Sequence, residues 1–266
     1  MKGQIGSLIY REWCIMKKSF ILSGTAVFCI MLMMTLFALS AKYGNLARQI
    51  DGGNKELKTL SDMFIFSVTF LIPYCAMAAA LDSGMYISDI RAGWTRYSIT
   101  LPVSTKTKAL AHTLFLAIRT GAALVFSVIV VASVNAAMGT AFNFGMLADI
   151  GIICILSLLF AVMTEICQSL PKDEILYKKR QNICGMVFIG LGLLLGLYMA
   201  KASTKYTEEF AAANGDEPVE LIPPELTDKY FAFRNAAAPF ILPVIILLII
   251  GIYFIVKKNL DKQKKL

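Results

Sequence analysis

Histidine is nearly absent from this sequence of 266 residues, and several common catalytic signatures are missing altogether. His112 is the only histidine, so any mechanism that needs two histidines is excluded. There is no G-x-x-x-x-G-K-[ST] phosphate loop, no H-E-x-x-H zinc site and no G-x-S-x-G nucleophile turn. We therefore expect no catalytic residue, no metal site and no cofactor bound by this chain.

Charge is also scarce, since charged residues make up 17% of the chain and hydrophobic residues 57%. A soluble domain carries roughly 25% charged residues. The net charge of +8 could suggest a nucleic-acid partner, but the basic residues lie in short segments between apolar runs, a pattern typical of membrane topology. None of the six cysteines lies in a segment that we expect outside the cell, and no C-x-x-C pair occurs. Disulfides, structural zinc and nucleic-acid binding are therefore not expected.

The apolar residues gather into runs of about 20, the length that crosses roughly 30 Å of hydrocarbon. These runs predict an all-α, polytopic membrane protein with six transmembrane helices. The predicted spans are about residues 20–40, 62–82, 112–135, 146–168, 183–200 and 237–256. Of the 26 lysines and arginines, 17 lie in segments on one side of these spans and 8 on the other. This excess places both termini in the cytoplasm.

Two segments outside the spans carry structural expectations of their own. In residues 1–19 the apolar side chains recur on one helical face, which predicts an amphipathic helix in the membrane interface with Trp13 at headgroup depth. A basic tail with chance periodicity is the alternative. Residues 201–236 form a long polar loop that we expect outside the cell, with a short helix near 225–235.

Ionisable residues within or beside spans are informative because they are costly in lipid. Asp82, Arg119 and Glu165 fall at a similar depth on the predicted cytoplasmic side. We hypothesise that Arg119 pairs with Glu165 or Asp82 across helices, the alternative being that it extends to the headgroups. Asp62 and Asp149 lie at predicted outer edges, where water is close.

A G-x-x-x-G pattern, Gly192 and Gly196, lies in the fifth predicted span. Such spacing permits the close approach of two helices. The pattern fits packing within the chain and packing between two chains equally well.

The predicted cytoplasmic loop 83–111 is longer and more aromatic than a simple connection requires. It places Trp94 and Tyr97 among arginines and lysines, a composition typical of protein-docking surfaces. Pro102 breaks any helix ahead of it, and Ser104 is suited to cap the helix that follows. A belt of interfacial aromatics is the alternative explanation of the two rings.

Eight residues of this loop carry a family resemblance: Asp89, Gly93, Trp94, Arg96, Tyr97, Leu101, Pro102 and Ser104. Their pattern resembles the first cytoplasmic loop of type-2 ATP-binding-cassette exporter permeases, the small bacterial subunits encoded apart from their ATPase. The resemblance implies location in a bacterial plasma membrane and a second permease, identical or sibling, around a shared pathway. It also implies a P-loop ATPase that holds ATP and Mg²⁺ and docks on residues 86–104, with Trp94, Tyr97 and Leu101 as anchors. A smaller contact is implied at residues 169–182.

These observations favour an exporter subunit that moves an amphipathic substrate such as a peptide, a lipid-like molecule or a drug. Two alternatives stay open. One is a non-transporting membrane protein, such as a sensor partner, an assembly factor or an immunity protein. The other is an ion-coupled secondary carrier, although such carriers usually place acidic or polar groups near the midplane, and no midplane acid is found here.

Overall fold

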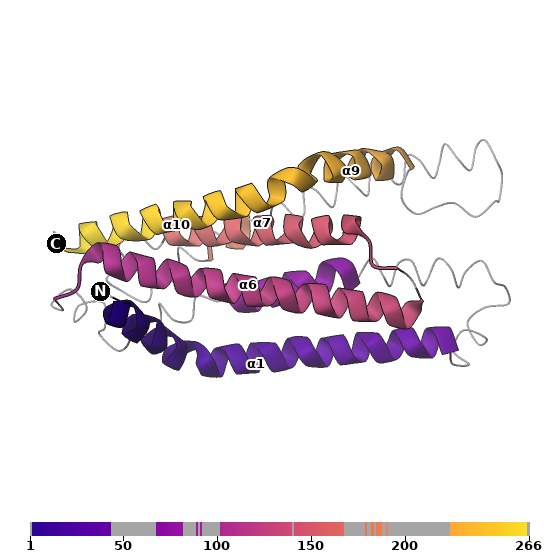
Figure 1. Cartoon of the computed structure of the whole chain (residues 1–266), viewed down its shortest axis with the longest axis horizontal. Coiled ribbons are helices and arrows are strands. Elements are labelled where there is room, and N and C mark those ends of the chain that lie inside the picture. Colours follow the sequence, from indigo (N-terminus) through magenta and orange to yellow (C-terminus); the bar gives the residue numbers. More distant parts are fainter. Residues whose placement is uncertain are drawn as a thin grey trace.

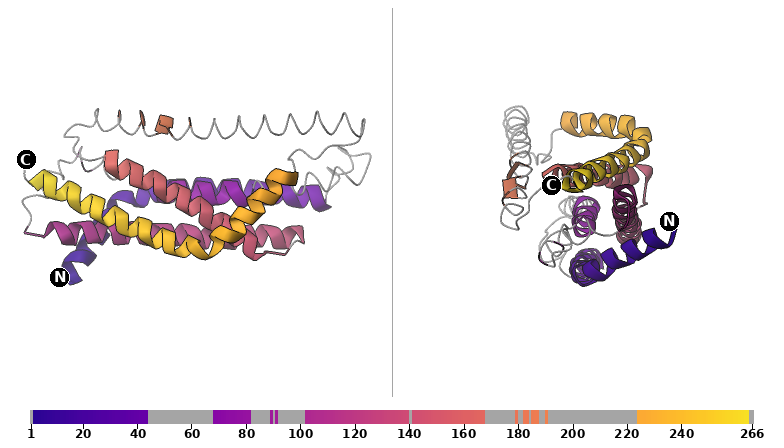
Figure 2. Two further views of the ribbon diagram at one scale, coloured as in Figure 1. Left: turned by 90° about the horizontal axis from the view of Figure 1, so that it is seen from above. Right: turned by 90° about the vertical axis from the view of Figure 1, so that its left-hand side faces the viewer.

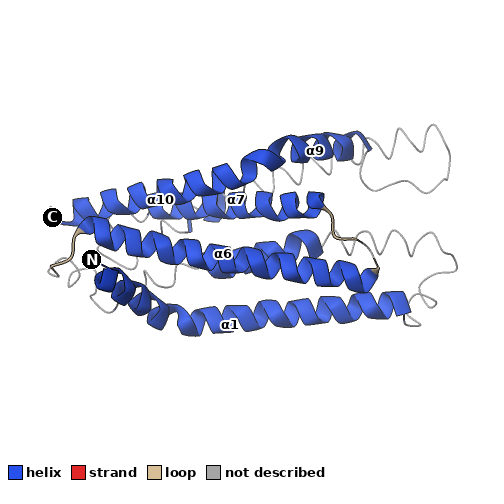
Figure 3. Cartoon of the chain, viewed as in Figure 1, coloured by secondary structure: helices blue, strands red, loops and turns tan. Residues whose placement is uncertain are grey.

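The computed structural model describes residues 2–43, 68–81, 89, 91, 102–139, 141–167, 179, 182–183, 185–187, 190 and 224–264. Every regular element in this described part is helical (Figures 1 and 3). The elements are α1 (Lys2–Tyr43), the short helix Val68–Ala80, α6 (Thr105–Met138), α7 (Phe144–Cys167), α9 (Pro224–Ala237), the 3-10 turn η1 (Ala238–Phe240) and α10 (Ile241–Lys264).

Three helices are long and apolar enough to cross a membrane: Thr105–Ala137, Phe144–Ile166 and Asp228–Lys262. They coincide with the third, fourth and sixth predicted spans. The helix of the third span begins at Thr105 rather than at the predicted residue 112, because its first two turns are formed by the end of the predicted loop 83–111. Of the second predicted span, the structure describes Val68–Ala80. Most of the fifth predicted span, including Gly192 and Gly196, lies outside the described residues.

The first helix, α1, is bent by 51° between Gly3–Lys18 and Phe20–Met33, and the two halves count as a fourth candidate span if they are taken together. The bend coincides with the boundary expected between the interfacial helix and the first span. Met16 is buried against Phe115 of α6, whereas Trp13 is 42% exposed with its ring 6.0 Å from that of Phe20. Part of the apolar face of residues 1–19, with Met16, therefore packs in the bundle, and another part, with Trp13, is exposed.

The centre of the bundle is α6, which packs against α1, α7 and α10. One apolar cluster joins it to the helix Val68–Ala80, α7 and α10, and a second joins it to that short helix and α1. Polar side chains inside the bundle bond to their own helix. Thr113 and Ser127 each donate to the carbonyl oxygen four residues earlier, at 2.9 and 2.7 Å. These bonds satisfy hydroxyl groups that would otherwise be costly in an apolar setting.

A tight connection makes α6 and α7 antiparallel. Gly139 ends α6 in the left-handed conformation, with φ 71° and ψ 21°, and its N–H bonds to the carbonyl of Ala136. Only glycine adopts this conformation at little cost. Four residues later, Asn143 accepts a hydrogen bond from the backbone N–H of Met146 at 3.0 Å and so caps the first turn of α7.

The long polar segment ends in α9, whose residues include the short helix expected near 225–235. Pro239 lies in η1 and Pro243 in the first turn of α10. Proline removes a backbone donor and disturbs the regular ladder, which accounts for the 3-10 turn between α9 and α10. The chain changes direction there, as Figure 2 shows from a second side.

Both chain termini and the start of α6 lie at the same end of the bundle, which we call the terminal end (Figure 1). The connection between α6 and α7 and the helix α9 lie toward the other end, which we call the opposite end.

Candidate functional site

Asp89, the first residue of the loop motif, is helical and forms an ion pair with Arg11 of α1. The second guanidinium nitrogen of Arg11 donates to the other Asp89 oxygen at 3.4 Å. The side chains keep only 22% and 13% of their surface exposed. Burial raises the pKa of the Asp89 carboxyl, and the adjacent Arg11 opposes that rise. The start of the loop is thus attached to the N-terminal helix.

The sole histidine lies between two carboxylates at the terminal end. The Nδ1 atom of His112 on α6 is 3.5 Å from Oε1 of Glu12 on α1. Its Nε2 atom is 3.4 Å from Oε1 of Glu165 on α7. Glu12 is buried, and among the described residues its Oε2 atom has no hydrogen-bond partner. We call Arg11, Glu12, Asp89, His112 and Glu165 the terminal cluster.

Most of this cluster was not predicted from the sequence. His112 was given no role, and Arg119 was hypothesised to pair with Glu165 or Asp82. A signal was present, because Glu12 follows Ile9 by three residues and precedes Met16 by four, which puts an acid on the apolar face. An acid in that position indicates a buried partner.

Arg119 is buried, with 5% of its surface exposed. Its Nη2 atom lies 3.5 Å from the carbonyl oxygen of Ala79, and the guanidinium lies 5.4 Å from the centre of the Phe115 ring. Ala79 belongs to the last turn of the short helix Val68–Ala80, whose carbonyls lack partners within the helix. A cation there also complements the helix dipole. Asp82, the other partner hypothesised for Arg119, lies outside the described residues.

The other end of the loop leads directly into α6. Ser104 caps this helix as the sequence predicted, because its Oγ accepts a hydrogen bond from the backbone N–H of Thr107 at 3.1 Å. Pro102 is exposed just before the cap. The remaining motif residues lie outside the described part: Gly93, Trp94, Arg96, Tyr97 and Leu101.

A second polar cluster lies at the opposite end and joins α7 to α9. Tyr230 donates a hydrogen bond of 2.6 Å to Oδ1 of Asp149, and Nη1 of Arg234 lies 3.6 Å from Oδ2. Asp149 lies in the second turn of α7 and is only 5% exposed. Its burial was not predicted from the sequence: α9 packs over Asp149 and supplies a phenol and a guanidinium as its partners. We call Asp149, Tyr230 and Arg234 the opposite cluster.

Two glycines of α7 permit this close packing. A Cβ atom added at Gly145 would lie 2.6 Å from Cζ of Arg234, and one added at Gly151 would lie 2.5 Å from Cγ2 of Ile241. A side chain at position 145 would have to move the flexible guanidinium of Arg234, and one at position 151 would have to move the side chain of Ile241.

In the part of the chain that the structure describes, no group of three or more His, Cys, Asp or Glu side chains is placed to hold a metal ion. In the described part, both clusters link helices through hydrogen bonds and ion pairs. Comparison with known proteins gives no matching family model, no matching curated protein and no matching solved structure. The family resemblance therefore rests on the loop residues and the helical architecture.

Proposed function

We propose that this chain is the membrane-spanning permease subunit of an ATP-driven exporter, with six spans, an interfacial N-terminal helix and cytoplasmic termini in a bacterial plasma membrane. Its pathway would be shared with a second copy or a sibling permease. The substrate would be amphipathic: a peptide, a lipid-like molecule or a drug. ATP and Mg²⁺ would be held by a separate P-loop ATPase docked on residues 83–111.

The observation that supports this proposal best is how the described ends of the loop are held. Asp89 is attached to α1 through Arg11, and Ser104 opens α6. Both attachments lie at the terminal end, together with the two chain termini (Figure 1). A loop held at both ends against long helices is suited to transmit a movement of a docked partner to those helices.

The terminal cluster supplies the contacts through which that movement would reach the bundle. Movement of the loop would act on α1 through the Arg11–Asp89 pair and on α6 directly. His112 then contacts carboxylates on α1 and α7, so three helices share one polar junction. ATP-driven closure of the ATPase would use this junction to shift the bundle between inward-facing and outward-facing states.

Co-purification tests the proposal. The tagged chain is extracted gently from its native membrane and its partners are identified by mass spectrometry. We expect a roughly stoichiometric soluble P-loop ATPase that is lost when Trp94 and Tyr97 are both changed to alanine. The matched control changes Tyr10 and Trp13, an exposed aromatic pair of the same spacing on α1.

Other outcomes would change the proposal in different ways. An ATPase retained after the loop substitutions would keep the transporter and move the interface elsewhere. No ATPase, under conditions that preserve other complexes, would favour a non-transporting membrane protein. Transport in vesicles driven by an ion gradient without ATP would favour a secondary carrier.

A further inference from the structure

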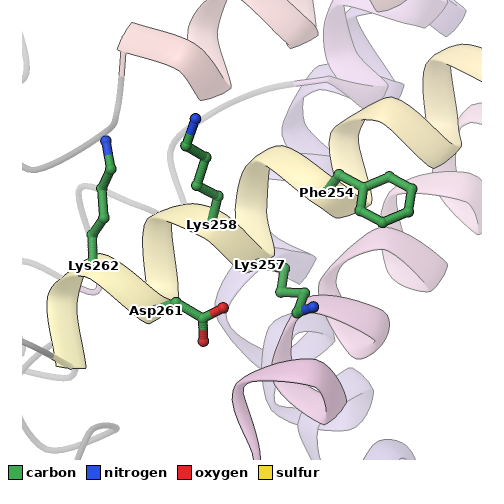
Figure 4. Close-up of a pocket in the computed structure, with 5 residues that line it drawn as sticks. All are labelled: Phe254, Lys257, Lys258, Asp261 and Lys262. Carbon is green, nitrogen blue, oxygen red and sulfur yellow. The ribbon is translucent and has the colours of Figure 1, made fainter.

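The last turns of α10 border a hollow of about 480 Å³. This volume lies within the range of small-ligand sites, about 300–1,000 Å³. The described residues that line it are Phe254, Lys257, Lys258, Asp261 and Lys262 (Figure 4). Four lysines and one aspartate occupy the final eight residues of the helix, so the hollow lies in a strongly basic region.

Two of the lysines are free to bind a ligand. Lys258 and Lys262 are four residues apart, and Figure 4 shows both side chains extending from the same side of the helix. Both are exposed, and within the described part of the chain no ion pair engages either of them. Lys257 and Asp261 lie on the other side in the same view. Two adjacent ammonium groups are suited to bind a phosphate diester.

An apolar surface leads up to these lysines. Phe254 is 60% exposed and precedes Lys258 by one turn, which is about 6 Å along the helix axis. Further back on α10, Leu247 and Ile250 are exposed as well. This helix is a candidate membrane span, so its exposed apolar side chains would face acyl chains. The order of apolar surface followed by ammonium groups matches the order of acyl chain and phosphate in a phospholipid.

We propose that the C-terminal end of α10 is a binding site for an anionic glycerophospholipid. Lys258 and Lys262 bind the headgroup phosphate, and Phe254 contacts the first part of an acyl chain. The apolar half of the site distinguishes a lipid from free phosphate or nucleic acid, which have no acyl chain to place there. Basic side chains beside membrane helices are known to select anionic headgroups in this way. The site does not depend on the transporter proposal.

Native mass spectrometry of the full chain tests this site. The protein is offered an equimolar mixture of phosphatidylglycerol and phosphatidylcholine in detergent, and the retained lipids are counted. We expect preferential retention of phosphatidylglycerol. Because each lysine near an anionic headgroup contributes roughly fivefold in affinity, K258Q/K262Q should reduce the preference by roughly 25-fold. The F254A variant should weaken retention of both lipids while leaving the preference in place.

The matched control is K17Q/K18Q, which removes two exposed lysines from α1. It should leave the preference unchanged, and the thermal unfolding of each variant checks that the bundle is intact. An equal loss in both double variants, or no loss in K258Q/K262Q, would overturn the site. Full displacement of the lipid by millimolar inorganic phosphate would also overturn it, because the ligand would then be the free anion.

Discussion

The two ends of the helix bundle hold buried carboxylates in different ways. At the opposite end, one carboxylate, Asp149, receives a phenol hydrogen bond of 2.6 Å and a guanidinium at 3.6 Å. At the terminal end, three carboxylates share one arginine and one histidine, and the histidine contacts are long, at 3.4 and 3.5 Å. Strong N–H···O hydrogen bonds are shorter, about 2.7–3.2 Å.

This difference separates a fixed junction from an adjustable one. The opposite cluster joins two helices with a short hydrogen bond, so it holds α9 on α7 in one geometry. The terminal cluster joins α1, α6, α7 and the start of the loop, and neither contact of His112 there is as short as the Tyr230–Asp149 hydrogen bond. Both clusters keep unpaired atoms in the described part, on Glu12 and His112 at the terminal end and on Arg234 at the opposite end. The difference therefore rests on the long contacts of His112, which can exchange partners more readily than a short hydrogen bond. The adjustable junction lies where we propose that the ATPase acts.

Removing the carboxylate of the fixed junction should have the largest effect. Asp149→Ala leaves Arg234 partly buried without its counter-ion, and removing one partner of a buried pair typically costs about 3–5 kcal/mol. We expect a loss of about 3 kcal/mol, the low end, because Arg234 keeps 18% of its side chain exposed. Thermal unfolding in detergent measures it. Asp261→Ala, at the end of α10, should cost far less, and equal losses would show that Asp149 is not a junction.

Close packing beside the opposite cluster should be the next most sensitive feature. Gly151→Ala places a Cβ atom 2.5 Å from Cγ2 of Ile241, and such overpacking costs about 1–3 kcal/mol. The control is Gly121→Ala on α6, where nothing lies within 4 Å of the added atom. Unfolding midpoints should fall for the first variant and stay or rise for the second. A stable Gly151→Ala protein would mean that α7 and α10 can separate freely.

The cap that opens α6 should contribute less. Ser104→Ala removes the acceptor for the Thr107 N–H, and losing such a cap costs about 1 kcal/mol. Ser133→Ala, near the other end of α6, removes only a hydroxyl bonded to its own helix and should be nearly neutral. If both changes had the same effect on the unfolding midpoint, the cap would have no special role.

The smallest effect concerns the pH dependence of the terminal end. Burial raises the pKa of Asp89 above its ordinary 3.8, and the Glu12 carboxylate adds to the rise while Arg11 and His112 oppose it. The folded chain then holds a proton that the unfolded chain has released, so stability falls as pH rises from 3.8 through the raised pKa.

Asp89→Asn should remove this part of the slope. The measurement compares unfolding midpoints of the wild type and the variant as pH increases from acid. Parallel curves would contradict a pKa of Asp89 that burial raises.

Local signals in the sequence predicted several features that the structure shows. Ser104 and Pro102 predicted the start of α6 because capping depends on adjacent residues, and the apolar runs predicted its course and that of α7. The contacts within the clusters could not be predicted in the same way. Glu12 and His112 are 100 residues apart, and a contact between residues so far apart produces no periodic pattern in the sequence. The burial of Asp149 could not be predicted because it depends on α9, a helix from another part of the chain.

The most direct test of the docking claim compares an aromatic position of the predicted docking loop with one at the opposite end. A photo-crosslinking amino acid replaces Trp94 in one variant and Phe144, which is 72% exposed at the opposite end, in the other. After irradiation of intact cells, crosslinked partners are identified by mass spectrometry. The proposal predicts a P-loop ATPase crosslinked from position 94 and not from position 144. No ATPase from position 94, or equal yields from both, would contradict it.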